Sequence, residues 1–328
     1  MKKAKGNVLE KKKGNNGFGK NQGFKKVEDL GIESGESALS LTQKMGKCGF
    51  QATHLEKAIE LIERMKKENC TIFLGFTANL MASGLRGILE EMCRKGFVDA
   101  IVTTAGSTDH DIIKSFMPYS IGSFQADDVE LHKRGINRLG NIFVETKGFE
   151  VLEKKMQQWL KEFYSKEKVL APSRLNKLVG EKLPKGSFLR ACADKKIPVF
   201  CPGITDGAIG LQMHFFKQEN KGFAVDVTKD MKGLASLVLG AEKTAAIILG
   251  GGISKHHIIG ANILRDGLDY AVYVSTASEF DGSLSGAMAR EAKSWGKIKE
   301  LGKTVQLHCD ATIAFPLIAA ALAENGLL

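Results

Sequence analysis

Short apolar runs alternate with longer amphipathic segments along most of this chain, and this alternation restricts the possible folds more than any other feature. The runs cover residues 71–75, 100–104, 198–201, 245–249, 270–274 and 304–308. Apolar residues at helical spacing mark segments 55–67, 80–94, 255–264, 286–295 and 313–324. Apolar strands separated by helices are typical of a parallel sheet that is covered on both faces. The sequence therefore predicts an α/β fold with a mostly parallel sheet and helices on both faces.

Two regions depart from this alternation. Residues 149–195 are more polar, contain Trp159 and many Lys and Glu residues, and are predicted to form a helical insertion packed on the sheet. Residues 1–26 hold nine Lys against the single acid Glu10, with too few apolar residues to offset the chain entropy lost on folding. We therefore predict a basic, mobile tail over residues 1–26 and one α/β domain over residues 27–328.

The charge of the chain is concentrated in that tail. The formal net charge is +10, of which the tail carries +8, so residues 27–328 are nearly neutral at +2. The pI of 9.2 is therefore no sign of a dedicated nucleic-acid site in the folded domain.

The compartment is predicted from what the chain lacks. Its six cysteines lie far apart without a C-x-x-C pair, which is typical of reduced, mostly buried thiols in the cytoplasm. No apolar stretch follows the N-terminal lysines, so a secretory signal is not expected. The most apolar segments, residues 245–253 and 311–323, are too short to cross about 30 Å of hydrocarbon. We expect a cytoplasmic protein without a membrane anchor.

Small and polar residues follow four of the predicted strands, at residues 76–79, 105–109, 250–252 and 275–277. In open α/β sheets, ligands bind at the carboxyl ends of strands, and a glycine run lets backbone amides approach a phosphate. The run Gly250 to Gly252 does not complete G-x-G-x-x-G, because Lys255 stands at the last glycine's place. From the residues alone, a nucleotide loop and an ordinary tight turn between strand and helix remain equally open.

A second group of reactive residues lies near the C-terminus. His256 and His257 point about 100° apart on a helix, so at most one faces a site, and the alternative is one core and one surface histidine. No partner spacing indicates a metal. Lys297 follows Trp295 and Gly296, and an aromatic wall that excludes water leaves an amine nucleophilic for Schiff-base chemistry. Glu291, six residues earlier, is placed to hold a cationic substrate.

These motifs together resemble the deoxyhypusine synthase family. The resemblance runs from about residue 49 to 316 and is carried by GGGISKHH at 250–257, YAVY at 270–273, EFDGS at 279–283 and SWGKI at 294–298. Upstream, it is carried by GFQAT at 49–53, residues 79–86, TTAG at 103–106, GINR at 135–138 and TDG at 205–207. The resemblance implies a Rossmann-like sheet.

The resemblance also implies an activity. Members of the family use NAD to take a hydride from spermidine, and the aminobutyl part passes to an active-site lysine as 1,3-diaminopropane leaves. That part is then delivered to a specific lysine of the hypusine-bearing translation factor. By position, Lys297 resembles the covalent nucleophile and His256 the residue that assists proton transfer. Trp295 resembles the wall against the aliphatic chain, and Glu291 resembles the ammonium anchor.

The resemblance assigns the other site positions and the assembly. The implied NAD-binding residues are Asn79, Thr104, Ala105, Gly106, Asp206, Gly251, Thr276, Ala277, Asp310 and Ala311. The implied substrate-binding residues are Asp109, His110, Gly282, Ser283, Glu291 and Trp295. The family is homotetrameric with sites at subunit interfaces, so one chain is not expected to form a complete site.

The amine pocket departs from the family pattern. Leu211 and Leu284 stand where eukaryotic members carry Asp, His110 stands where they carry Glu, and Gly260 replaces Asn. Of five acidic positions along the amine tunnel, Asp109 and Glu291 remain acidic. A polyamine needs carboxylate partners, because burial of an unpaired charge is costly. The substrate is therefore either anchored differently, through His110, Gln212 or His214, or is another amine.

Two other functions remain open from the sequence. A homospermidine synthase-like enzyme would transfer the same aminobutyl group to a free amine, and the sequence holds no motif that separates the two acceptors. A non-catalytic NAD- or RNA-binding protein with this fold is disfavoured by Lys297 and by the absence of RNA-binding motifs. The tail would cover a neighbouring subunit's entrance, attract an acidic partner, or have neither role.

Overall fold

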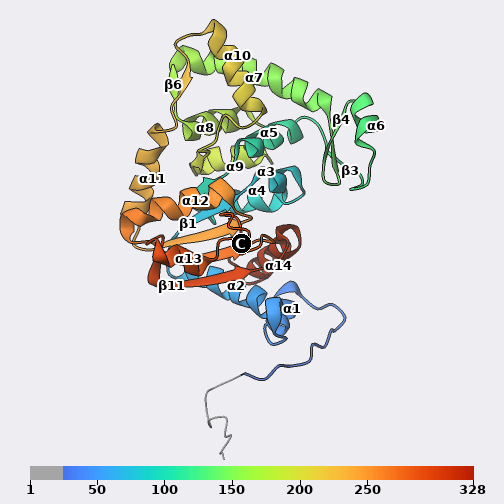
Figure 1. Ribbon diagram of the computed structural model, residues 1–328, viewed down its shortest axis with the longest axis vertical. Helices are drawn as coiled ribbons and strands as arrows, with labels where there is room; N and C mark the ends of the chain where they lie inside the picture. The colour runs from blue at the N-terminus through green and yellow to red at the C-terminus, as the bar shows by residue number, and fades with distance from the viewer. Residues whose placement is uncertain (1–24) are drawn as a thin grey trace, which may run out of the picture.

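A six-stranded parallel sheet lies at the centre of the computed structural model, which describes residues 25–328 (Figure 1). The predicted tail lies outside the described residues, except for the exposed Lys25 and Lys26. The strands are β1 (Thr71–Phe76), β2 (Ala100–Val102), β7 (Val199–Phe200), β9 (Thr244–Leu249), β10 (Leu268–Val274) and β11 (Ile298–Leu307). Each of the six predicted strands is thus present, and β11 begins earlier than predicted.

The strand order is β11-β10-β9-β1-β2-β7, and all neighbours pair in parallel. From β1 the chain moves outward through β2 to β7, and it then returns to build β9, β10 and β11 on the other side of β1. This is the doubly wound order of a Rossmann-like sheet. The direction reverses between β1 and β9, and the carboxyl ends of these two strands therefore border a crevice.

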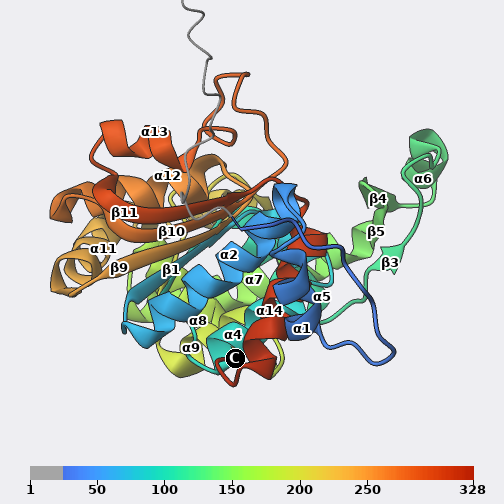
Figure 2. The ribbon, with the colours of Figure 1, turned by 90° about the horizontal axis from the view of Figure 1, so that it is seen from below.

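The two faces of the sheet are buried by different helices (Figure 2). Side chains alternate along β1, so that Ile72, Leu74 and Phe76 join one core while Phe73 joins the other. The first core includes α2 (Phe50–Lys67), α4 (Arg86–Arg94) and α14 (Ala311–Glu324). The second includes α11 (Lys229–Gly240), α12 (Gly252–Ala261) and α13 (Ala289–Ser294). The prediction of helices on both faces is confirmed.

The predicted insertion is helical and packs on the first core. It consists of α7 (Thr146–Lys166), α8 (Pro172–Lys182) and α9 (Phe188–Lys195). Other elements were not predicted: α1 (Ala38–Met45), α5 (Ala105–Lys114), α10 (Ala208–Glu219), and the paired strands β6 (Val169–Leu170) and β8 (Ala224–Val225). A small antiparallel sheet of β3 (Ser120–Ile121), β4 (Ile136–Leu139) and β5 (Ile142–Glu145) projects from the body with α6 (Asp128–Lys133) (Figure 1).

Two predicted helices differ from those observed. The segment 80–94 is not one helix: α3 (Ala78–Ala82) ends at Ser83, whose backbone is extended, and α4 begins at Arg86. The ammonium of Lys114 donates to the carbonyls of Met81, Ala82 and Ser83 and thereby satisfies the end of α3. The predicted helix 286–295 is shorter as α13, which begins only after Met288, whose backbone is extended.

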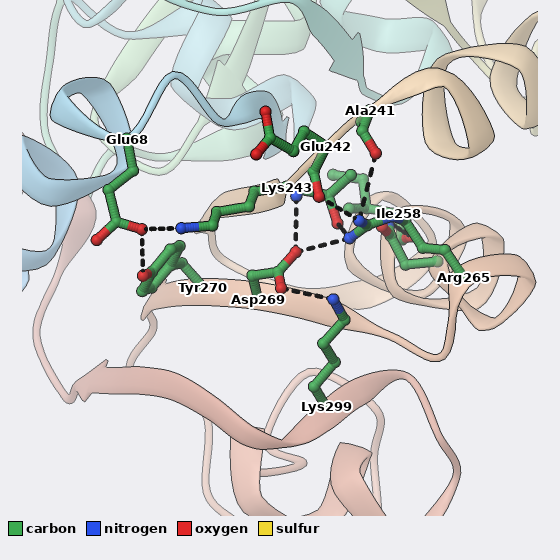
Figure 3. A network of polar contacts seen from close by, with 11 residues as sticks. Glu68, Ala241, Glu242, Lys243, Ile258, Arg265, Asp269, Tyr270 and Lys299 are labelled. Carbon is green, nitrogen blue, oxygen red and sulfur yellow. Dashed lines mark hydrogen bonds and ion pairs between the residues drawn. The ribbon is translucent and has the colours of Figure 1, made fainter.

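A polar network fixes the amino ends of β9, β10 and β11 (Figure 3). Asp269 accepts from Arg265 Nη1 and Lys299 Nζ, both at 2.6 Å. Glu68 accepts from Lys243 and from Tyr270, and these contacts, with Arg64, lower its pKa to about 2. The network lies at the edge of the sheet opposite the crevice, so we assign it to stability.

Within residues 25–328, no helix combines the length and the apolar character needed to cross a membrane.

Candidate active site

A cleft of about 110 Å³ lies where the strand order reverses. It is lined by Thr77 after β1, Gly250 after β9 and Thr276 after β10. The predicted cofactor residues Asn79, Thr276, Asp310 and Ala311 all line it. Residues that lie more than 200 positions apart in the sequence therefore meet at one place, as expected for a ligand site at a topological switch point.

Backbone geometry shapes this cleft around the start of α12. Gly250 has φ +88°, a conformation that favours glycine. A Cβ on Gly251 would lie 2.6 Å from the Cα of Ser285, so glycine lets the chain at Ser285 lie directly against the helix start. Asp310 caps α14 by accepting from the amide of Thr312 at 2.6 Å. The chain at the start of α12 and the start of α14 therefore border the same cleft.

The other predicted cofactor residues adjoin the cleft. Thr104 Oγ1 accepts from the amide of Ala78 at 3.1 Å and thus joins the starts of α5 and α3. A Cβ on Gly106 would lie 2.8 Å from the Cβ of Ala78, so a glycine allows the two helices to approach. Ala105 is the first residue of α5 and is buried, whereas Asp206 is exposed on the turn before α10.

A larger cleft of about 600 Å³ shares Thr276 with the first cleft and also contains the predicted residue Ala277. Its other walls come from α2, through His54 and Lys57, and from β11 and the chain that follows it, through Gln306 and His308. The two clefts thus lie on either side of Thr276.

Lys297 and His256 are in direct contact, although 41 residues separate them in the sequence. The Nζ of Lys297 lies 3.2 Å from His256 Nε2 and 5.1 Å from the centroid of the Trp295 ring. Lys297 immediately precedes β11, where its carbonyl accepts from the amide of Leu268 at the start of β10, and His256 lies on α12. The structure therefore brings together the predicted nucleophile, proton-transfer residue and aromatic wall.

The environment of His256 keeps its imidazole neutral. Burial lowers the pKa of His256, and the nearby charge of Lys297 lowers it further. A neutral imidazole with its Nε2 toward an amine can accept a proton from that amine. His257, the other of the two adjacent histidines, is partly buried.

A small cavity of about 30 Å³ lies beside Lys297. Its lining includes the predicted site residues Glu291, Trp295 and Lys297. Lys255 and Tyr273, which were not predicted as site residues, also line it. Lys255 is 1% exposed, and the hydroxyl of the buried Tyr273 has no hydrogen-bond partner within residues 25–328. Both lie within the motifs that carried the family resemblance, but nothing in their own spacing distinguished them from core residues.

The remaining predicted substrate residues lie elsewhere in this chain. Asp109 is 4% exposed, and its two oxygens accept from the amides of Ala208 and Ile209 at the start of α10. Burial raises its pKa to about 6, against the effect of these amides. Gly282 and Ser283 form an exposed turn in which the Ser283 amide donates to Asp281. Their roles in substrate binding stay predictions.

The positions where the chain departs from the family pattern have different surroundings. Leu284 lines the small cavity beside Glu291, whereas Leu211 is 53% exposed on α10. Gln212 is buried and bonded to Gln157, and His214 is exposed. Glu291 is thus the one carboxylate among the residues that line this cavity.

His110 is buried on α5, and its Nδ1 lies 2.8 Å from the hydroxyl of Tyr119. Burial, with a smaller effect of the Lys114 charge, lowers the pKa of His110 from 6.5 to about 4. Because the pKa of His110 is lower in the folded protein than in the unfolded chain, the unfolded chain binds more protons than the folded protein between pH 4 and pH 6.5. The stability from neutral His110 is therefore complete above pH 6.5 and is lost as the pH falls towards 4.

We expect His110→Gln to remove this dependence. The free energy of unfolding of the unmodified protein, relative to His110→Gln, should fall by up to about 3 kcal/mol between pH 7 and pH 4. Urea unfolding at several pH values measures this difference. The exposed His132→Gln variant is the matched control and should follow the unmodified protein. A pH-independent difference for His110→Gln would contradict the prediction.

Comparisons with known proteins agree with this geometry. The family model for deoxyhypusine synthase matches residues 40–322. A "Probable deoxyhypusine synthase" from Thermoplasma acidophilum is 41% identical over 297 residues, covering 90% of this chain and 96% of that protein. One from Ignicoccus hospitalis is 42% identical over 302 residues, covering 90% and 94%.

The solved structure "Crystal Structure of a putative deoxyhypusine synthase from Entamoeba histolytica" has a TM-score of 0.66 at 25% identity, covering 90% of this chain and 96% of that one. A complex of AgrE with ornithine and NAD+ shares the fold, with a TM-score of 0.53 at 14% identity over 84% of this chain and 33% of that one. On the family match and the identity of its relatives, this chain belongs to the deoxyhypusine synthase family.

Proposed function

We propose that this protein is an NAD-dependent deoxyhypusine synthase that passes the aminobutyl part of spermidine, through Lys297, to a lysine of the hypusine-bearing translation factor. The contact between Lys297 Nζ and His256 Nε2 carries the proposal, because it places an amine nucleophile beside a neutral base. The family match and the cleft at the strand reversal support it. A cytoplasmic location is part of the same proposal.

The residues of the first cleft fit a dinucleotide. The cleft lies at the switch point, glycines bring the backbone close at the start of α12, and Asn79, Thr276 and Asp310 offer polar groups on three sides. Thr104 and Gly106 position the start of α5 at the same edge. NAD, when bound there, would accept a hydride from the carbon next to the substrate nitrogen and would return it to that carbon once the acceptor lysine holds the four-carbon chain. The protein's task is then to hold the amine and to move its protons.

Lys297 and His256 would perform the transfer. The Nζ of Lys297 forms a bond to the imine carbon of the oxidised substrate, and the bond from that carbon to the nitrogen of 1,3-diaminopropane breaks. The proton that Nζ sheds moves to the leaving nitrogen, and His256 Nε2 is placed to relay it. Lys297 retains the four-carbon chain until the acceptor lysine displaces it.

Glu291 and Trp295 would hold the substrate. Glu291 is the carboxylate of the small cavity, and it would pair with the terminal ammonium of the amine. The ring of Trp295 would lie along the aliphatic chain. Leu284 provides apolar contact where eukaryotic members have an acid, so this cavity offers fewer charges to a polyamine.

We extend the proposal to the assembly, with two chains completing each site of a homotetramer. Trp295 is 66% exposed, and His256 also faces solvent, so a single chain does not exclude water from Lys297. A second copy over this face would supply the missing wall. Light scattering should then give a mass about four times that of the 35.6 kDa chain.

Borohydride trapping tests the proposed function. The protein is incubated with NAD+ and spermidine, reduced and digested, and the peptide that contains Lys297 is examined by mass spectrometry. The expected result is an aminobutyl adduct on Lys297 that is absent without NAD+. An unmodified peptide from protein shown to bind NAD+ would overturn the proposal. Labelled spermidine with either the precursor factor or putrescine then separates a protein acceptor from a free amine.

A glycine substitution tests the cofactor site. We expect Gly251→Ala to raise the Kd for NAD+ at least about tenfold, because the new methyl displaces Ser285 from the start of α12. Calorimetric titration measures the Kd. Gly240→Ala is the control, since a Cβ there meets nothing within 4 Å. Equal affinity of the Gly251→Ala and unmodified proteins would contradict the assignment.

A further inference from the structure

Lys255 is a buried lysine that forms no ion pair within residues 25–328. Its residue is 1% exposed, and its Nζ donates to the carbonyls of Ser285 at 3.2 Å and Ala287 at 2.9 Å. The Nζ also lies 5.1 Å from the centroid of the Tyr273 ring. Burial of an amine away from carboxylates is costly, so its persistence here calls for a specific role.

Both carbonyls belong to one segment, the loop of residues 275–288 that connects β10 to α13. The first part of this loop carries Thr276 and Ala277, which line the two clefts. Its last part carries Leu284 and Ala287, which line the small cavity beside Lys297. The middle is exposed, and the side chain of Phe280 is 89% exposed. One loop therefore forms a wall of both the cofactor cleft and the amine cavity.

The loop is tied to the body at several points. The amide of Ser275 donates to the carbonyl of Leu307, Glu279 pairs with Arg290 of α13, and the returning half of the loop contacts the body beside Lys255. Gly286 packs against the carbonyl of Ser278, which folds the loop back on itself. Ser285 packs against Gly251 at the start of α12. Each van der Waals contact of this kind is weak and has no preferred direction. Such contacts alone do not keep the loop in one position on the body. The two hydrogen bonds from Lys255 are the directional links between the returning half of the loop and α12.

We propose that Lys255 is a positioning residue that fastens the loop of residues 275–288 to α12, so that the cofactor cleft and the amine cavity keep a common wall. The proposal rests on the proposed function for its effect on turnover, but the tether itself is a property of the fold. In this role Lys255 acts through the carbonyls of Ser285 and Ala287.

The protonation of Lys255 is compatible with this role. Burial lowers its pKa to about 8, while the charge of Glu291 acts in the opposite direction. Other titratable groups near it are Tyr273 and Lys297, which share the cavity, and His256 at the adjacent position. An uncharged amine retains two N–H donors, which is the number that the two carbonyls need. The tether therefore persists when Lys255 loses its proton.

The test compares Lys255→Met with Lys255→Arg. Methionine keeps the apolar stem without a donor, whereas arginine keeps the donors. Loss of two hydrogen bonds should raise the Kd for NAD+ about tenfold and the KM for spermidine similarly, with a smaller change in kcat. Chymotryptic cleavage after the exposed Phe280 should accelerate about tenfold. In Lys255→Arg, the Kd for NAD+, the KM for spermidine and the cleavage rate should return most of the way to those of the unmodified protein.

Lys229→Met is the matched control, because Lys229 also donates to a backbone carbonyl, that of Val169, at a site far along the chain from the loop. It should leave the Kd and the cleavage rate unchanged. If Lys255→Met does not fold, Lys255→Gln is used instead, because the shorter glutamine side chain cannot reach both carbonyls.

Unchanged cleavage and unchanged Kd in the donor-free variant would overturn the proposal. Accelerated cleavage in a protein that forms no adduct on Lys297 would support the tether while the proposed function fails, so the two failures are distinguishable.

Discussion

Lys297→Arg should leave the fold intact and reduce aminobutyl transfer by at least about 10³-fold, because it removes the covalent nucleophile. Arginine keeps the positive charge and the contact with the Trp295 ring, but its guanidinium cannot lose a proton in the accessible pH range. The variant therefore removes the nucleophile while it keeps the charge and the aromatic contact. Product formation from labelled spermidine, measured at saturating NAD+, gives the rate.

The control for this prediction is Lys293→Arg on α13. Lys293 precedes Lys297 by four residues and donates to the carbonyl of Glu300 at 2.7 Å. It is not among the residues that line the small cavity. Its replacement should change the rate less than about twofold. Thermal unfolding of both variants should resemble that of the unmodified protein. A Lys297→Arg enzyme with substantial turnover would show that another group forms the bond to the substrate.

The central sheet could be predicted from the sequence because most of its strands are apolar and buried along their length, although the edge strand β11 is partly exposed. The run of residues 245–249 is apolar at every position, and all of β9 is buried. The small sheet of β3, β4 and β5 could not be predicted in this way, because its strands are two to four residues long and mostly exposed. Its stability comes from pairing between strands and leaves no apolar pattern.

Long-range contacts account for the other differences. The break after α3 depends on the ammonium of Lys114, more than 30 residues away, and no local signal beyond Ser83 and Gly84 marks it. The contact of Lys297 with His256 likewise depends on the order of β9, β10 and β11. The sequence identified both residues through the family resemblance, while the tether from Lys255 required the positions of Ser285 and Ala287.

Three consecutive residues of α5 illustrate the limit of reasoning from residue type. Asp109, His110 and Asp111 are polar, and the first two were assigned to the substrate by resemblance. In the structure all three are buried, and each contacts a different element. Asp109 caps α10, His110 contacts Tyr119, and Asp111 joins α5 to α4 and α9. Polar residues in one helix turn can thus serve packing as well as chemistry.

Asp111→Ala should therefore destabilise the fold strongly. Asp111 is fully buried, and its carboxylate accepts from Arg86 Nε at 2.7 Å and from the amides of Phe188 and Leu189 at 3.1 and 2.8 Å. Alanine leaves the guanidinium of Arg86, 17% exposed, without its carboxylate, and it leaves two amides at the start of α9 unpaired. Breaking a buried pair in this way lowers the free energy of unfolding by about 3–5 kcal/mol.

Asp127→Ala provides the matched comparison for urea unfolding. Asp127 also accepts from two backbone amides, those of Val129 and Glu130 at the start of α6, but it is exposed to solvent. Water can replace its carboxylate there, so the loss should be about 1 kcal/mol. The contrast isolates burial, because both variants remove an aspartate that caps a helix. Equal losses in the two variants would mean that the Arg86–Asp111 pair does not hold α4, α5 and α9 together.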